Sequence, residues 1–274
     1  MGHTRLGAIP KTKRFVQVVA AMTGAGGGAS GGGSEQEERR DGLLPDDVPY
    51  IARQVLKATE DGLIAAVKDE GLRHTVYLLT QIVLASRMEN WQEPLKQAGI
   101  DLPSNATPFD LTSEVQRAID RHLTARSAVT DVSEIAQQAA GEALLTLTTS
   151  KADTLFGADL QPALRALSTK AGFSNLGQQF FSQFMYRYLN FYLSRVTAKY
   201  TGGERLPTVG ELARFNKTLE AHCFQSAYIV HDFCGGWYSK TNFEQGINQH
   251  NTSNFLRIAL QKLRRELAQQ EEGK

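Results

Sequence analysis

Residues 24–34 read GAGGGASGGGS, and this glycine-rich run is the feature that most limits what the chain can fold into. Glycine has the greatest backbone freedom of any residue, and the run has no large apolar side chain whose burial would offset the loss of that freedom. We therefore expect a flexible tether here. It divides the chain into a basic N-terminal arm at residues 1–22, a flexible linker at 23–42 and a folded domain at 43–274.

The domain shows the apolar spacing of amphipathic helices and no convincing strand alternation. Capping residues and glycines divide it into helical segments, with Gly172 and the pair Gly235-Gly236 predicted to end two of them. The sequence predicts an all-α fold, an irregular multi-helix bundle of about seven to nine helices. The expected helices span residues 47–70, 72–88, 89–98, 110–126, 131–149, 159–171, 174–199, 208–233 and 252–270.

The segment 174–199 is the dominant element. Its aromatic and aliphatic side chains cover roughly 240° of a helix, which predicts a central helix surrounded by its neighbours. Two alternatives are that part of this aromatic face meets another chain, or that it forms a groove for a small ligand. The rest of the helix is a narrow polar stripe, on which Gln183→Ala is expected to change stability by no more than about 0.5 kcal/mol. The stripe consists of Gln179, Gln183, Arg187, Asn190 and Ser194.

The N-terminal arm carries four cations and no carboxylate, next to a short apolar patch. Cations beside apolar residues suit an acidic protein surface or phosphates. Docking of the arm on its own domain is the third alternative. The candidate partner-binding residues are Arg5, Lys11, Lys13, Arg14 and Phe15.

The two cysteines, Cys223 and Cys234, fall on one predicted helix, eleven positions and so about 16 Å apart. That separation excludes a disulfide between them and a shared metal ion. Free thiols suit a reducing compartment, and no apolar run reaches the roughly 18 residues of a membrane span. We therefore expect a cytoplasmic protein without a metal or another cofactor.

A polar segment at 237–251, read as a loop after the double glycine, is the best candidate for a specific site. Its side chains suit a phosphate or carboxylate, although lids, caps and turns use the same residue types. The adjacent His231-Asp232 is similar to the metal-binding pair of the HD phosphohydrolases, but that family needs a later aspartate and none follows Asp232. The candidate ligand-loop residues are His231, Trp237, Tyr238, Lys240, Asn242 and His250.

The sequence contains none of the common nucleotide-binding, zinc-protease or serine-hydrolase motifs. Its net charge of +1 gives no overall basic footprint for nucleic acid. We expect a non-catalytic accessory or scaffold subunit of a bacterial-type cytoplasmic assembly, which binds protein partners through the arm and an aromatic helical face. The alternatives are a nucleic-acid-binding module that uses the arm and the basic patch at 262–265, and an enzyme with a site near His231, Lys240 and His250.

Overall fold

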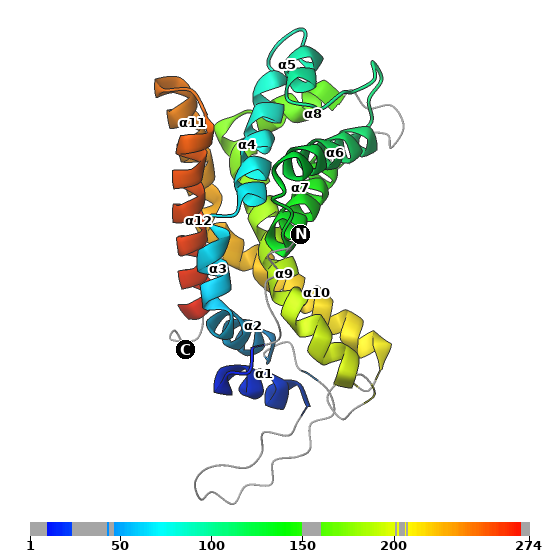
Figure 1. The fold of residues 1–274 in the computed structure, drawn as a ribbon, viewed down its shortest axis with the longest axis vertical. Coiled ribbons are helices and arrows are strands. Elements are labelled where there is room, and N and C mark those ends of the chain that lie inside the picture. Colours follow the sequence, from blue (N-terminus) through cyan, green and yellow to red (C-terminus); the bar gives the residue numbers. More distant parts are fainter. Residues whose placement is uncertain are drawn as a thin grey trace, which may run out of the picture.

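The computed structural model describes residues 10–23, 43, 47–149, 160–200, 202, 206 and 208–269, so the predicted tether and Arg5 lie outside the described residues. Within these ranges every regular element is a helix (Figure 1), which confirms the all-α class with more helices than the seven to nine expected. The helices are α1 (Lys13–Thr23), α2 (Asp47–Ala58), α3 (Glu60–Ala66), α4 (Glu70–Ala85), α5 (Gln92–Gln97), α6 (Pro108–Arg126), α7 (Asp131–Thr149), α8 (Leu160–Leu167), α9 (Lys170–Tyr200), α10 (Val209–Ser226), the 3-10 helix η1 (Ala227–Val230), α11 (His231–Glu244) and α12 (Gln249–Gln269).

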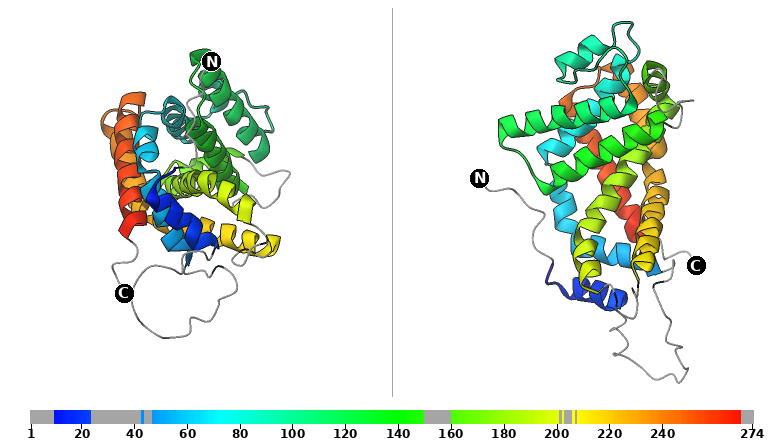
Figure 2. Two further views of the ribbon diagram at one scale, coloured as in Figure 1. Left: turned by 60° about the horizontal axis from the view of Figure 1, so that its bottom comes forward. Right: turned by 90° about the vertical axis from the view of Figure 1, so that its right-hand side faces the viewer.

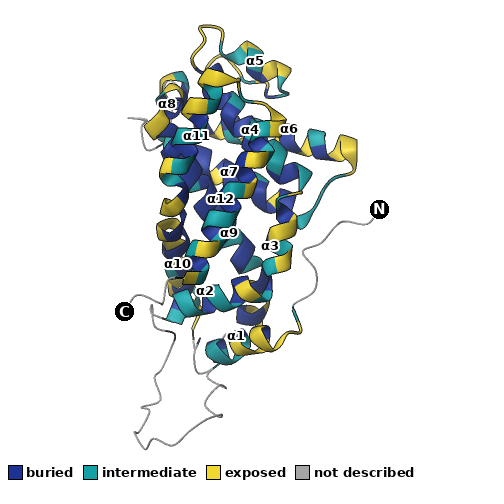
Figure 3. Cartoon of the chain, turned by 90° about the vertical axis from the view of Figure 1, so that its left-hand side faces the viewer, coloured by how far each residue is buried: buried dark blue, intermediate teal, exposed yellow. Residues whose placement is uncertain are grey.

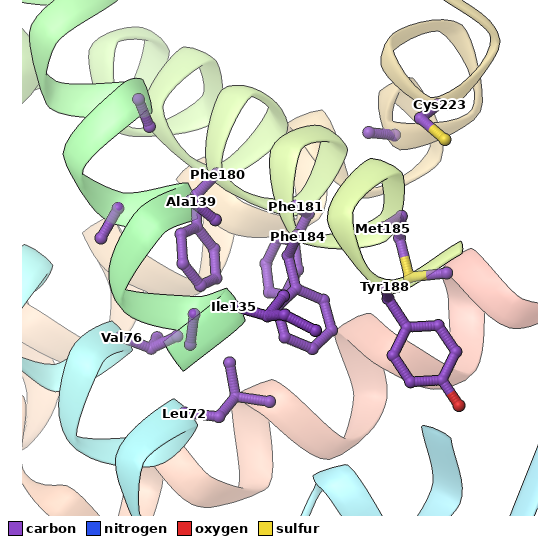
Figure 4. Packing of buried hydrophobic residues seen from close by; sticks show 14 of the residues in the cluster. Leu72, Val76, Ile135, Ala139, Phe180, Phe181, Phe184, Met185, Tyr188 and Cys223 are labelled. Atoms are coloured by element: carbon purple, nitrogen blue, oxygen red, sulfur yellow. The ribbon is translucent and has the colours of Figure 1, made fainter. Parts of the chain in front are cut away.

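The 31-residue helix α9 is the axis of the core. It packs against α7, α10 and α11 and also meets α2 and α8, so its sides are covered by the protein's own helices (Figures 1 and 3). Phe180, Phe184 and Tyr188 are each no more than 1% exposed. Phe180 and Phe184 point among residues of α4 and α7 (Figure 4), whereas Tyr188 reaches Thr59 at the end of α2. Most of the aromatic face of this helix therefore lies in the hydrophobic core, as a central helix requires, and only Tyr186 and Phe191 of its described aromatic residues are half-buried.

The segment predicted as one helix over 47–70 is broken at Thr59 into α2 and α3. The Thr59 hydroxyl donates back to the Val55 carbonyl oxygen at 2.8 Å, a local bond that competes with continued helix. The Thr59 carbonyl oxygen accepts from the Gly62 and Leu63 amides at the start of α3 and also from the buried Tyr188 hydroxyl at 2.7 Å. A tyrosine at the centre of the core thus has the hydrogen-bond partner that its burial requires.

Two predicted helix ends are wrong because the glycines serve close packing. Gly172 lies in the first turn of α9, where a Cβ would overlap the Ala166 carbonyl. Gly235 lies inside α11, where a Cβ would overlap the Ser174 hydroxyl and the Lys170 carbonyl oxygen. Glycine is needed at these positions because another element approaches the backbone, so α11 continues through the segment that was predicted to be a loop.

The polar stripe of α9 is divided between two environments, which also differs from the prediction. Gln183 is only 4% exposed, and its side-chain amide donates to Glu220 of α10 at 2.7 Å. Arg187, Asn190 and Ser194 instead line a groove beside α7. Gln183 was expected to be a neutral surface position, and it is a buried hydrogen-bonding one.

The remaining helices enclose α9 and its partners. Helix α12 packs against α2, α4 and η1 (Figure 2). The last described helix therefore lies beside two helices from the first half of the chain. Helix α1 lies across one end of the molecule against α2, while α6 covers α7 on another side (Figures 1 and 2). None of the helices in the described part of the chain is both long and apolar enough to cross a membrane.

Candidate functional site

The arm residues that the structure describes are divided between the core and the surface. Phe15 is 2% exposed and packs with the rest of the apolar face of α1 toward α2, so its side chain is not available to a partner in this conformation. Lys11, Lys13 and Arg14 are exposed. The last two line a groove of about 430 Å³ together with Lys57, and the carboxylates of Glu60 and Asp61 line the same groove.

The six ligand-loop candidates do not converge on one point. They lie on α11 and at the start of α12. The candidates that contact other side chains each contact different neighbours. Trp237 stacks on Phe255 with ring centroids 4.1 Å apart. Tyr238 is buried, stacks on Phe173 at 4.2 Å and accepts a hydrogen bond from Arg87 at 3.2 Å. These two residues are packing elements of the α9–α11–α12 junction.

The other four candidates are more exposed but separate. Lys240 and His250 have exposed side chains and Asn242 is half-buried. His231 lies at the rim of the core, 2.8 Å from the Asp232 carboxylate oxygen and 3.1 Å from the Asn175 side-chain oxygen. The imidazole thus lies within hydrogen-bond distance of two oxygen acceptors, to one of which the neutral ring can donate. The Asp232 side chain beside it is 93% exposed.

The cysteines are buried and free, with Cys223 on α10 and Cys234 on α11 because η1 interrupts the helix predicted between them. Burial raises the pKa of both thiols, so they behave as small apolar core residues and not as nucleophiles. Across the described ranges, no group of three or more histidine, cysteine and acidic side chains is placed to hold a metal ion.

The basic patch predicted at 262–265 is interrupted by intramolecular pairing. The Arg264 guanidinium donates to Glu60 of α3 at 2.7 Å, and the Lys262 ammonium lies 5.6 Å from the centroid of the Phe233 ring. Arg265 is exposed. Two of the three cations therefore already have partners within the fold, which weakens this segment as a continuous track for phosphates.

Three exposed apolar residues lie close together in sequence at the bend where α10 passes through η1 into α11. Phe224, Tyr228 and Ile229 are 44%, 64% and 43% exposed, and we call these three residues the apolar corner. Isolated exposed apolar side chains are ordinary, but three neighbours at one bend form a patch of the kind that marks binding surfaces.

Contacts with the core support the apolar corner. The Tyr228 ring stacks on His231 with centroids 5.3 Å apart, and His231 is fixed in turn by Asn175 of α9. The Phe224 carbonyl oxygen accepts from the Gln178 side chain of α9 at 3.2 Å. The corner is thus connected to α9, the axis of the core, through His231 and through the backbone at Phe224.

Sequence reasoning missed the corner because 208–233 was predicted as one uninterrupted helix. Phe224 and Tyr228 are four positions apart, a spacing that places side chains on one helical face. They lie off the stripe that carries Leu219, Cys223 and Val230 into the core. That second apolar face beside the core stripe is the signal that was available in the sequence.

No protein family model, no curated protein and no solved structure matches this chain. Its function is therefore inferred from its own surfaces.

Proposed function

We propose that this chain is a non-catalytic accessory subunit that binds a partner protein through the apolar corner. The observation that carries the proposal is the exposure of Phe224, Tyr228 and Ile229 together at the α10–η1–α11 bend. Aromatic residues are enriched at the buried centres of protein interfaces, and tyrosine is among the residues that dominate binding energy there. The proposed setting is a bacterial-type cytoplasmic assembly.

The support of the corner by α9 favours tight binding. Side chains that are ordered before association lose little conformational entropy when a partner covers them. Tyr228 rests on an imidazole that is itself hydrogen-bonded, and the backbone at Phe224 is tied to Gln178. The exposed Asp232 beside the corner supplies a charge at the rim, where it contributes to specificity more than to affinity.

The arm supplies a second proposed contact. Lys11, Lys13 and Arg14 remain exposed while the apolar face of α1 is buried, so an acidic partner surface can reach the cations without displacing α1. The apolar corner takes the place of the α9 aromatic face in this proposal, because that face is enclosed in the core.

A photo-crosslinking amino acid placed at position 228 tests the proposal in cells that express the full chain. We expect one defined partner band. Unlabelled protein that competes for the partner should suppress this band. The Tyr228→Ala variant of the competitor should need an at least tenfold higher concentration to do so, a loss of about 1.4 kcal/mol in binding free energy. Phe243 is 90% exposed on α11 and provides the matched control, because a crosslinker there lies on an exposed aromatic outside the corner.

An identical partner band from position 243, or full competition by Tyr228→Ala, would show that the corner is not the interface. The melting temperature of Tyr228→Ala should stay close to that of the unaltered protein, since a residue 64% exposed contributes little to the core. A folded variant that has lost its partner therefore separates binding from stability.

A further inference from the structure

An apolar groove of about 270 Å³ lies between α3 and α12. Figure 3 shows α12 between α3 on one side and the α10 and α11 helices on the other, so the groove and the apolar corner lie on different sides of α12. Aliphatic side chains from both helices line the groove, and Ile64 remains 50% exposed there. These aliphatic residues are Leu63, Ile64, Val67 and Leu260.

The charged side chains that line this groove are both cations. They are Arg257 and Arg264, whereas the groove beside α1 is also lined by the carboxylates of Glu60 and Asp61. The Arg264 guanidinium is already paired with Glu60 at 2.7 Å. Arg257 lies seven residues earlier on α12, about 10 Å along the helix axis. It is exposed and forms no hydrogen bond or ion pair within the described part of the chain, so the groove combines apolar surface with one available guanidinium.

The size of the groove favours side chains of a protein over a small molecule. Its volume of about 270 Å³ lies below the roughly 300–1,000 Å³ that is typical of small-ligand sites. Small pockets of this kind receive the anchor residues of protein interfaces. The complement of the groove is therefore a projecting apolar surface with a carboxylate at its edge.

The apolar corner has both of these properties. It projects at a bend, and its Tyr228 side chain is 64% exposed. Asp232 follows Tyr228 by four positions, and its side chain is 93% exposed. One oxygen of this carboxylate lies 2.8 Å from the His231 imidazole, and the other makes no hydrogen bond within the described residues. A guanidinium can therefore pair with Asp232 without displacing His231.

We propose that the apolar corner of one copy of this chain docks in the α3–α12 groove of a second copy, with Tyr228 on the aliphatic residues and Asp232 paired with Arg257. The inference rests on the proposed function of the corner and names its partner. Because the corner and the groove are different surfaces, the contact is head-to-tail, and each docked copy keeps one of the two surfaces free. Successive contacts then join several copies into a ring or a continuing chain.

Sedimentation velocity of the full chain between about 1 and 100 µM tests the proposal. We expect the average mass to rise above that of a single chain as the concentration rises. Asp232→Arg and Arg257→Asp should each raise the dissociation constant at least tenfold, because each brings like charges together across the contact. Arg214→Asp makes the same charge change on the exposed surface of α10, and as the matched control it should associate like the unaltered protein.

A mixture of the two single variants gives the sharpest measurement. In the mixture, each corner meets a groove of opposite charge on the other variant, so association should return although neither variant associates alone. Ile64→Ser removes apolar surface from the groove and leaves both charges in place. It should raise the dissociation constant at least threefold if the corner docks on this surface.

Three results would overturn the inference in variants whose circular dichroism is unaltered. They are a chain that stays single at about 100 µM, association that Arg257→Asp leaves unchanged, and a mixture of the single variants that does not associate. Crosslinking from position 228 separates this inference from the proposed function. A second copy gives a band at twice the mass of the chain. A band that contains another protein supports the corner as an interface and overturns the second copy, and the absence of any band overturns both.

Discussion

At the scale of single residues, two adjacent glycines of α11 have different roles. A Cβ on Gly235 would overlap atoms of α9, whereas a Cβ on Gly236 would meet no atom within 4 Å. We predict that Gly235→Ala destabilises the protein by about 1–3 kcal/mol through overpacking. Gly236→Ala should stabilise it by about 0.5–1 kcal/mol, because alanine loses less backbone entropy within a helix.

Chemical denaturation of the two variants measures both signs with one method. If the free energy of unfolding keeps the same slope against denaturant concentration, each substitution acts on the native state. Equal destabilisation by both changes would mean that α11 does not approach α9 through Gly235.

The core position Phe184 and its sequence neighbour Gln183 give a second residue-scale prediction. Phe184 is fully buried, so Phe184→Ala should cost about 3–5 kcal/mol. Gln183→Ala loses a buried amide and its bond to a carboxylate, and it should cost about 1–3 kcal/mol instead of the 0.5 kcal/mol or less expected for a surface residue. Equilibrium unfolding in urea gives both values. If Gln183→Ala left the free energy of unfolding unchanged, Gln183 would be a surface residue as first expected.

At the scale of elements, the sequence predicts helices well where local signals and packing agree. The helix predicted to begin at residue 208 does begin there, because the Thr208 hydroxyl accepts from the Glu211 amide at 3.2 Å and caps α10. The predictions fail where tertiary contacts decide. Thr59, at the break between α2 and α3, accepts from the distant Tyr188, and Gly235 lies inside α11 where α9 approaches it closely. Neither partner is near in sequence, so no local pattern contains this information.

The candidate site was predicted less well than the fold for the same reason. The residue types of the segment 237–251 can bind phosphate or carboxylate, but their expected placement depended on a loop, and the segment is largely helix. The apolar corner and the α3–α12 groove both depend on which face of a helix its neighbours leave open. Periodicity gives the faces of a helix, and only the assembled bundle determines which of them is covered.

Helix α1 is the element whose docking is easiest to perturb. Val18 is fully buried at its contact with α2, whereas Val16 is 62% exposed on the same helix. We predict that Val18→Asp releases α1, because a buried carboxylate without a partner is strongly unfavourable. Hydrogen exchange followed by mass spectrometry should then show faster exchange in α1 and unchanged exchange in α9.

Val16→Asp is the matched control and should leave the exchange of α1 as it is. If the exchange of α9 rose together with that of α1, the helix would be an integral part of the core and not a separable one.

At the scale of the whole molecule, stability should depend on pH through a stacked histidine pair that joins α4 to α6. The rings of His74 and His122 lie 3.5 Å apart and nearly parallel. Burial, with the nearby charges of His122 and Arg126, lowers the pKa of His74 to about 4. Burial and Arg126 also lower the pKa of His122, against the opposing effect of Glu70.

Because these folded-state pKa values lie below the usual value near 6.5, the unfolded chain takes up protons first as the pH falls. The stabilisation is complete above about pH 6.5 and is lost as the pH falls toward about 4. We predict a falling melting temperature across this window and a shallower fall in His74→Gln. His250→Gln removes an exposed imidazole on α12 and should keep the original slope. A slope unaffected by His74→Gln would assign the acid sensitivity to other groups.

The position of α12 also has a consequence for the order of events during synthesis. This helix packs on α2 and α4, which the ribosome makes much earlier. Until α12 emerges, the nascent chain carries an uncovered apolar side on its first long helices, and the core cannot close. Contacts between segments so distant in sequence form slowly, so the apolar sides of α2 and α4 are expected to stay exposed until α12 packs on them.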